Sequence, residues 1–137
     1  GSPRGITLVH ASGIGNKKEA GITRFAHKGM VKRVIGGHWG WSPEMQQMAV
    51  NGEIEAYNFS QGVICHLFRE IGAQRPGLLT KVGKYTFVDP RNGGGKLNDA
   101  TKEDLVRLME GTSICSIRRF PSTWRLSAAP VRMRTEM

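Results

Sequence analysis

Residues 31–62, VKRVIGGHWGWSPEMQQMAVNGEIEAYNFSQG, decide the fold class. A strand-like run over 31–37 ends in glycines, a helix-like run covers 41–52, and a second strand-like run covers 53–59. The helix has ordinary start and stop signals, which are an N-cap serine, a first-turn proline and acid, and a final glycine: Ser42, Pro43, Glu44 and Gly52. A strand, a helix and another strand in this order predict a parallel βαβ unit.

The segments on either side continue the alternation. The run ITLVHA at 6–11 is strand-like, and KEAGITRFAHKG at 18–29 predicts a short helix interrupted by glycine. A further helix is expected from its cap, Ser60, to Gly72, and it carries one apolar face: Val63, Ile64, Leu67, Phe68 and Ile71. We therefore predict an α/β fold with a partial, open, doubly wound parallel sheet and Rossmann-like layers.

The remaining segments are less regular. The segment 77–90 is strand-like or loop-like, and RNGGG at 91–95 breaks the pattern. A last helix is predicted from Thr101, with Asp104 as its capping-box partner and three apolar residues on its face: Leu105, Leu108 and Met109.

Three loops follow directly after predicted parallel strands: SGIGN at 12–16, GGHWG at 36–40 and YNFSQG at 57–62. Because parallel strands end at the same edge of a sheet, we expect these loops to lie together at its carboxyl edge. Open α/β sheets bind their ligands at that edge. The sequence therefore predicts a ligand site there.

The chain is strongly basic, with a formal net charge of +9. Much of the excess lies in residues 111–137, which contain five arginines and one acid, whereas the body has no compact basic stripe. A solvated basic face explains this distribution better than a nucleic-acid site. No apolar run is long enough to span a bilayer, and Cys65 and Cys115 form no CxxC pair, so we expect a cytoplasmic setting.

The short motifs are weak. Gly13-Ile14-Gly15 does not continue as GxGxxG, and RNGGGKL at 91–97 lacks the first glycine and the final Ser or Thr of a P-loop. Tight turns are the better interpretation of both. The four histidines have no metal-ligand spacing with one another or with the cysteines, so no metal site is predicted.

Two polar side chains are candidates for ligand contacts. His38 lies in a glycine loop at the presumed ligand edge, where a substrate hydrogen bond and a structural role are both open. Gln61 lies in the first turn of a helix at that edge, where it can orient a carboxyl or thioester group or be a simple exposed residue. Cys65 is one position from the apolar face of its helix, where a buried, inert thiol is the more common case.

Three longer stretches carry a resemblance to a known family. The strings GGHWG at 36–40, YNFSQG at 57–62 and TFVDPRNGGGKLN at 86–98 resemble family I coenzyme A transferases. The match is to the amino-terminal, α-type half of the propionate/acetate CoA-transferase branch, and it runs from about Pro3 to Glu110.

The resemblance implies transfer of coenzyme A between an acyl-CoA and a short-chain carboxylate. No covalently bound cofactor is implied, and acyl-CoA and the carboxylate are the expected ligands. In this family a glutamate carries coenzyme A as a thioester, and Gln61 is similar to a glutamine placed against that glutamate. The residues that the resemblance puts near substrate or coenzyme A are Gln61, Gly62, His38, Gly36, Gly37, Gly83, Tyr85 and Thr86.

The chain also departs from the family. The catalytic glutamate belongs to the carboxyl-terminal half, so no catalytic residue is expected here, and the family's first strand and glycine-rich loop do not precede Pro3. Tyr85 stands where the family usually has glycine, and its phenol is expected to hinder backbone approach to the ligand. We therefore expect a fragment that is inactive alone and that associates with itself or with a missing β-type half.

The segment 111–137 does not resemble the family's next strand, YLFYKAFPIDVA. When the codons of this segment are read in a frame displaced by two nucleotides, they can encode much of that strand. The tryptophan codon of Trp124 followed by a CGN arginine codon, for example, contains a displaced GCG, which encodes alanine, and Met133 followed by such an arginine codon gives the same alanine codon. The predicted organisation is a cloning remnant at 1–2, a partial transferase domain at 3–110 and a basic tail of frameshifted origin at 111–137. The alternative function is a non-catalytic module that binds itself, a partner or nucleic acid through this tail.

Overall fold

The computed structural model describes residues 3–109 and 114–118. In chain order its elements are β1 (Ile6–His10), η1 (Ile22–Phe25), β2 (Val31–Gly36), α1 (Pro43–Val50), β3 (Glu55–Asn58), α2 (Gln61–Gly72), β4 (Gly77–Thr80), η2 (Pro90–Asn92), β5 (Val106–Met109) and β6 (Ile114–Arg118). Within these residues, no helix has the length and apolar character needed to cross a membrane.

The first three strands form a parallel sheet in the order β1-β2-β3, as the alternation of elements predicts. Alternate side chains of β2 face opposite sides of this sheet, so that Val34 packs on the side of α1 and Ile35 packs on the side of α2. Helices therefore cover both faces, and the predicted α/β class with a doubly wound parallel sheet is confirmed.

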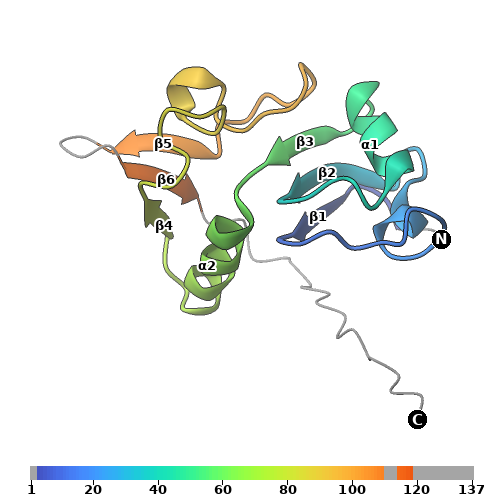
Figure 1. The fold of residues 1–137 in the computed structure, drawn as a ribbon, viewed down its shortest axis with the longest axis horizontal. Helices are drawn as coiled ribbons and strands as arrows, with labels where there is room; N and C mark the ends of the chain where they lie inside the picture. Colours follow the sequence, from blue (N-terminus) through green and yellow to red (C-terminus); the bar gives the residue numbers. More distant parts are fainter. Residues whose placement is uncertain (1–2, 110–113, 119–137) are drawn as a thin grey trace, which may run out of the picture.

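Helix α2 joins this sheet to a second one. Its buried residues Val63, Ile64 and Leu67 belong to one core with Ile35 and Tyr57 of the parallel sheet. The same core includes Leu78, Leu105 and Val106 from the second half of the chain. Figure 1 shows α2 between the two groups of strands.

The second sheet is antiparallel, in the order β4-β6-β5. The expectation of one open sheet is therefore wrong for the later strands. Its central strand, β6, lies inside the segment 111–137 that was expected to be a tail, and its backbone pairs with β4 and β5 on either side. The rest of that segment, 111–113 and 119–137, lies outside the described residues.

The predicted helix from Thr101 is wrong. Residues 101–105 have no regular structure, and 106–109 form β5. Thr101 does not cap a helix, because its hydroxyl is used by β3, and Asp104 forms an ion pair with Lys96 instead. Of the three residues predicted for its apolar face, Leu105 is buried in the core, whereas Leu108 and Met109 are exposed. Val106, which was not predicted, is buried instead, so the period was misread.

Two helix starts were predicted correctly, and Ser42 and Ser60 are their N-cap residues, but not through side-chain hydrogen bonds. Helix α1 begins at Pro43 and α2 at Gln61, but neither Ser42 nor Ser60 makes a side-chain cap hydrogen bond. The buried Ser42 hydroxyl instead pairs with the Thr23 hydroxyl at 2.8 Å. The helix predicted over 18–29 is reduced to the short η1, which starts after Gly21 in a left-handed conformation (φ 75°).

The outer edge of β3 is closed by the segment 95–101 rather than by a fourth strand. The Asn58 N–H donates to the Gly95 carbonyl at 2.8 Å, and the Leu97 N–H donates to the Ala56 carbonyl at 2.9 Å. The Thr101 hydroxyl accepts from the Ala56 N–H at 2.7 Å. This segment therefore satisfies backbone groups that an exposed edge strand leaves open.

We predict that Thr101→Val lowers the free energy of unfolding by about 1–3 kcal/mol, because the buried Ala56 N–H loses its hydrogen-bond partner. Urea denaturation followed by circular dichroism measures the change. Thr80→Val is the matched control, because the Thr80 hydroxyl accepts only from the Val82 N–H in an exposed turn. A loss no larger for Thr101→Val than for Thr80→Val would contradict the role given to the Thr101 hydroxyl.

Candidate functional site

The three loops that follow β1, β2 and β3 meet at the carboxyl edge of the parallel sheet, as predicted. The Gly37 N–H donates to the His10 carbonyl at 3.0 Å, and the Phe59 N–H donates to the Gly36 carbonyl at 3.1 Å. A Cβ on Gly37 would lie 2.2 Å from the Ala11 oxygen and 3.1 Å from Gln61 Cα. Only glycine at position 37 allows the backbones of the three loops to approach this closely.

Gln61 is the first residue of α2, and its side chain is exposed at the place where these loops converge. Gly62 follows it, also exposed, with open space around the position of a Cβ. The structure thus brings Gln61, Gly62, Gly36 and Gly37 together. An amide in this position is able to donate to one ligand oxygen and to accept from another.

His38 packs within the same group of loops. Its exposed ring lies 6.4 Å from the ring of Trp41, and a Cβ on Gly13 would lie 2.6 Å from His38 Cδ2 and 2.0 Å from Trp41 Cδ1. The Lys17 ammonium is 5.4 Å from the centre of the Trp41 ring. His38 therefore contributes to the packing of two loops, and one edge of its ring remains accessible to solvent.

A pocket of about 440 Å³ lies between α2 and the start of the loop after β4. It is lined by Ser60, Gly62, Val63, His66, Leu78, Leu79, Thr80 and Val82. Gly62 is the expected site residue in this lining, and Val82 directly precedes Gly83. The lining is largely apolar on the β4 side. Cys65 lies on the same helix and is exposed, so the expectation of a buried thiol is wrong.

The other expected site residues belong to a turn that is held together by Asp89. This buried carboxylate accepts from the Tyr85 N–H at 2.9 Å, from the Arg91 N–H at 3.0 Å and from the Arg91 guanidinium at 2.6 and 2.9 Å. These hydrogen bonds, first among them those from Arg91, hold the pKa of Asp89 well below its ordinary value. The Thr86 hydroxyl donates to the Gly83 carbonyl at 2.7 Å, so Thr86 has a structural role in this turn.

Tyr85 departs from the family's glycine at a position where the backbone favours glycine. Its φ is 67°, which is in the left-handed region. The ring is 73% exposed and lies 4.6 Å from the Lys84 ammonium and 5.4 Å from the Arg91 guanidinium carbon. The Tyr85 ring thus lies against the cationic side chains of Lys84 and Arg91, which belong to the same turn.

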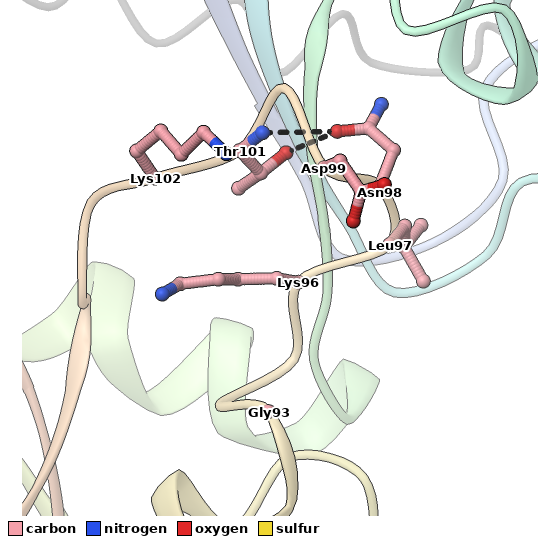
Figure 2. A pocket seen from close by; sticks show the side chains of 7 residues that line it. All are labelled: Gly93, Lys96, Leu97, Asn98, Asp99, Thr101 and Lys102. Atoms are coloured by element: carbon pink, nitrogen blue, oxygen red, sulfur yellow. Dashed lines mark hydrogen bonds between the residues drawn. The ribbon is translucent and has the colours of Figure 1, made fainter.

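A second hollow of about 440 Å³ lies beside the segment that closes the edge of β3, and Figure 2 shows its lining. The lining consists of Gly93, Lys96, Leu97, Asn98, Asp99, Thr101 and Lys102. Glycines 93–95 have φ values of 119°, 63° and 77°, and a Cβ on Gly95 would lie 2.5 Å from the Phe59 ring. The RNGGG motif is therefore a tight turn pressed against β3, as expected. The hollow contains none of the expected site residues.

Sequence reasoning missed a group of buried polar side chains at the carboxyl edge. His10 is 2% exposed, and its Nδ1 pairs with the Ser12 carbonyl at 2.8 Å. Burial lowers the pKa of its imidazole. Trp39 and Asn58 also carry buried polar atoms there. The available signal was that His10 and Asn58 are the last residues of their strands. Among the described residues, no group of three or more His, Cys, Asp or Glu side chains is arranged to hold a metal ion.

A family model described as "Coenzyme A transferase" matches residues 4–116. The chain belongs to the coenzyme A transferase family. The resemblance found in the sequence is thereby confirmed, and the match extends beyond Glu110 into β6.

Two kinds of curated relative are similar to this coenzyme A transferase chain. The acetate CoA-transferase YdiF of Escherichia coli (strain K12) is 43% identical over 109 residues, which are 80% of this chain and 20% of the relative. The caffeate CoA-transferase of Acetobacterium woodii is 44% identical over 110 residues, which are 80% of this chain and 21% of the relative. The chain thus spans about a fifth of the length of these relatives.

Solved structures of the same family have the same fold. The acyl-CoA transferase YdiF from E. coli O157:H7, solved as a thioester complex with CoA and as an apoenzyme, matches with a TM-score of 0.80 and 39% identity. The match covers 85% of this chain and 23% of the solved chain.

We predict that Tyr85→Gly raises the free energy of unfolding by up to about 1 kcal/mol, because glycine relieves the left-handed strain at this position. Urea denaturation measures the difference. Lys17→Gly is a positive comparison that should show a similar gain, because Lys17 also has a positive φ, 63°, in a different loop. A clear loss of stability in Tyr85→Gly would mean that the contacts with Lys84 and Arg91 outweigh the strain.

The lowered pKa of Asp89 gives a pH dependence. A carboxyl group with a depressed folded-state pKa stabilises the fold above its ordinary pKa, and this stabilisation is lost as the pH falls through the folded-state value. Below about pH 4, the free energy of unfolding should therefore fall more steeply for the natural chain than for Asp89→Asn. Denaturation at a series of pH values tests this. Parallel curves would show that Asp89 is not the group responsible.

Proposed function

We propose that this chain forms part of an acyl-CoA:carboxylate CoA-transferase, which moves coenzyme A between an acyl-CoA and a short-chain carboxylic acid. The observation that carries the proposal is the family match over residues 4–116. The names of the relatives support it, since one is an acetate and another a caffeate CoA-transferase, and a solved relative was obtained as a thioester complex with CoA. Nothing in these matches favours a nucleic-acid-binding module.

We propose that Gln61 orients the reacting carboxyl or thioester group. Its exposed side chain lies at the convergence of the three carboxyl-edge loops, beside the backbone of Gly37. The glycines of the 36–37 pair allow the ligand to approach main-chain atoms, and His38 lies on the solvent side of the same loop. The remaining candidates, Gly62, Gly83, Tyr85 and Thr86, are proposed to lie near the acyl-CoA.

The proposed transfer needs a carboxylate nucleophile that attacks the acyl thioester and displaces the CoA thiolate. The thiolate then attacks the resulting anhydride at the glutamyl carbonyl, so that the donor acid leaves as a free carboxylate and coenzyme A is carried as a glutamyl thioester. By resemblance, that glutamate belongs to the carboxyl-terminal half of the family. The present stretch is therefore proposed to supply one wall of the site and to act only with a complementary β-type half, whether or not it also associates with itself. The frameshifted origin of 111–137 stays a prediction that the encoding DNA decides.

We predict that the chain, mixed with the carboxyl-terminal half of a relative, exchanges labelled acetate into acetyl-CoA. Gln61→Ala should lower the exchange rate by about 100-fold, because a preorganised hydrogen bond to the reacting group is lost. Initial rates of label incorporation at saturating acetyl-CoA measure the effect.

Gln46→Ala is the matched control, because Gln46 is also an exposed glutamine but lies on α1. An equal rate for Gln61→Ala and the unchanged chain would overturn the role of Gln61. No exchange by a folded complex of the two halves, with acetyl-CoA and other short acyl-CoA donors, would overturn the proposed function itself.

A further inference from the structure

The side of the parallel sheet that faces α1 changes from apolar to polar at its carboxyl edge. Leu8, Val34 and Ala56 are register partners across the three strands and pack with the α1 core. The next row on the same face consists of His10, Gly36 and Asn58. Two polar side chains thus flank a glycine where the apolar core ends.

This polar row contains buried atoms without partners. His10 Nε2, Trp39 Nε1 and Asn58 Oδ1 are the buried side-chain nitrogen and oxygen atoms that have no hydrogen bond in the described part of the chain. Buried polar atoms in folded proteins are nearly always paired, and each unpaired one needs an explanation. His10 and Asn58 share a cross-strand row, and the Trp39 ring packs against the His10 ring, so His10 and Trp39 point to one common explanation.

Two of the unpaired atoms converge on one place. The position that a Cβ of Gly36 would take is 2.7 Å from His10 Nε2 and 3.1 Å from Trp39 Nε1. The two nitrogens are therefore less than about 6 Å apart, which is close enough for a single oxygen between them to hydrogen-bond to both. The rings meet edge to face, with centroids 6.3 Å apart, and no direct hydrogen bond joins them. A side chain at position 36 would collide with the His10 ring, because its Cβ would lie 2.7 Å from His10 Nε2.

The partners define the chemistry of the occupant. The Ser12 carbonyl can only accept, so His10 Nδ1 carries the proton and Nε2 is an acceptor. Trp39 Nε1 can only donate. The occupant must therefore donate to His10 and accept from Trp39. A carboxylate has no proton to donate and an ammonium has no lone pair to offer, whereas an O–H group has both.

We propose that His10 and Trp39 form a binding site for one O–H oxygen, which belongs either to an enclosed water molecule or to the hydroxyl of a small ligand. Burial lowers the pKa of the His10 imidazole, which favours the neutral form and agrees with an acceptor at Nε2. The site does not depend on the proposed transfer of coenzyme A, so each can fail without the other.

The test uses the full chain labelled with ¹⁵N, and it follows the Trp39 indole N–H and the His10 ring by NMR. We expect His10 to be protonated at Nδ1. We also expect one of two results at the Trp39 indole N–H. The first is a cross-peak to bound water that does not arise from proton exchange, and the second is a chemical-shift change that saturates with added glycolate and is absent with acetate. The first identifies water as the occupant, and the second identifies a ligand hydroxyl.

Trp39→Phe removes the donor but keeps an aromatic ring, so the response of His10 to glycolate, or the bound-water signal near it, should be lost. Trp41→Phe is the control, because Trp41 is 44% exposed and packs on His38 outside this group. Equal saturating responses to glycolate and acetate, a proton at His10 Nε2, or neither expected result at the indole would overturn the proposal. If Trp39→Phe does not fold, a crystal structure of the natural chain decides: absence of an oxygen within about 3.2 Å of both nitrogens would overturn it.

Discussion

The parallel pairing of β1 and β3 with β2 is the constraint on which the rest of this structure depends. Because His10, Gly36 and Asn58 are register partners, all three strands end at the same row. The loops that follow them must therefore leave from one edge. Hydrogen bonds from the Gly37 N–H to His10 and from the Phe59 N–H to Gly36 continue the pairing one step past the strands. A slip of one residue would move His10 to the other face of the sheet and separate Gly37 from Gln61.

The long string TFVDPRNGGGKLN at 86–98 also depends on this sheet. Asp89 organises the first part of the string, and the left-handed glycines at 93–95 turn the chain back toward β3. From Gly95 onward the backbone bonds to Asn58 and Ala56, and the Thr101 hydroxyl completes the row. The string therefore acts as a strap on the open edge of β3. This explains its glycines and its aspartate without assigning them to a ligand.

The local parts of the fold were predictable, and the long-range parts were not. Alternating strand and helix patterns were enough to predict β1 to β3 with α1 and α2, and topology rules placed their loops at one edge. The error at Thr101 has a physical cause: Thr-x-x-Asp followed by leucines three apart is a local helix signal, but Thr101 bonds to Ala56, 45 residues away. The pairing of β4 with β6 and the polar row at His10 likewise appear only when distant segments are brought into register.

Gly36 and Gly37 are adjacent in the chain, but they face different surroundings on the two sides of the sheet. Gly36 faces the α1 side, where a Cβ would meet the His10 and Trp39 rings. Gly37 approaches the α2 side, where a Cβ would meet the Ala11 oxygen and the start of α2 at Gln61. Each glycine thus has its own steric reason. A ligand group held at Gln61 and an oxygen held at His10 would lie on opposite sides of the same peptide unit, so displacement of this loop would alter both sites together.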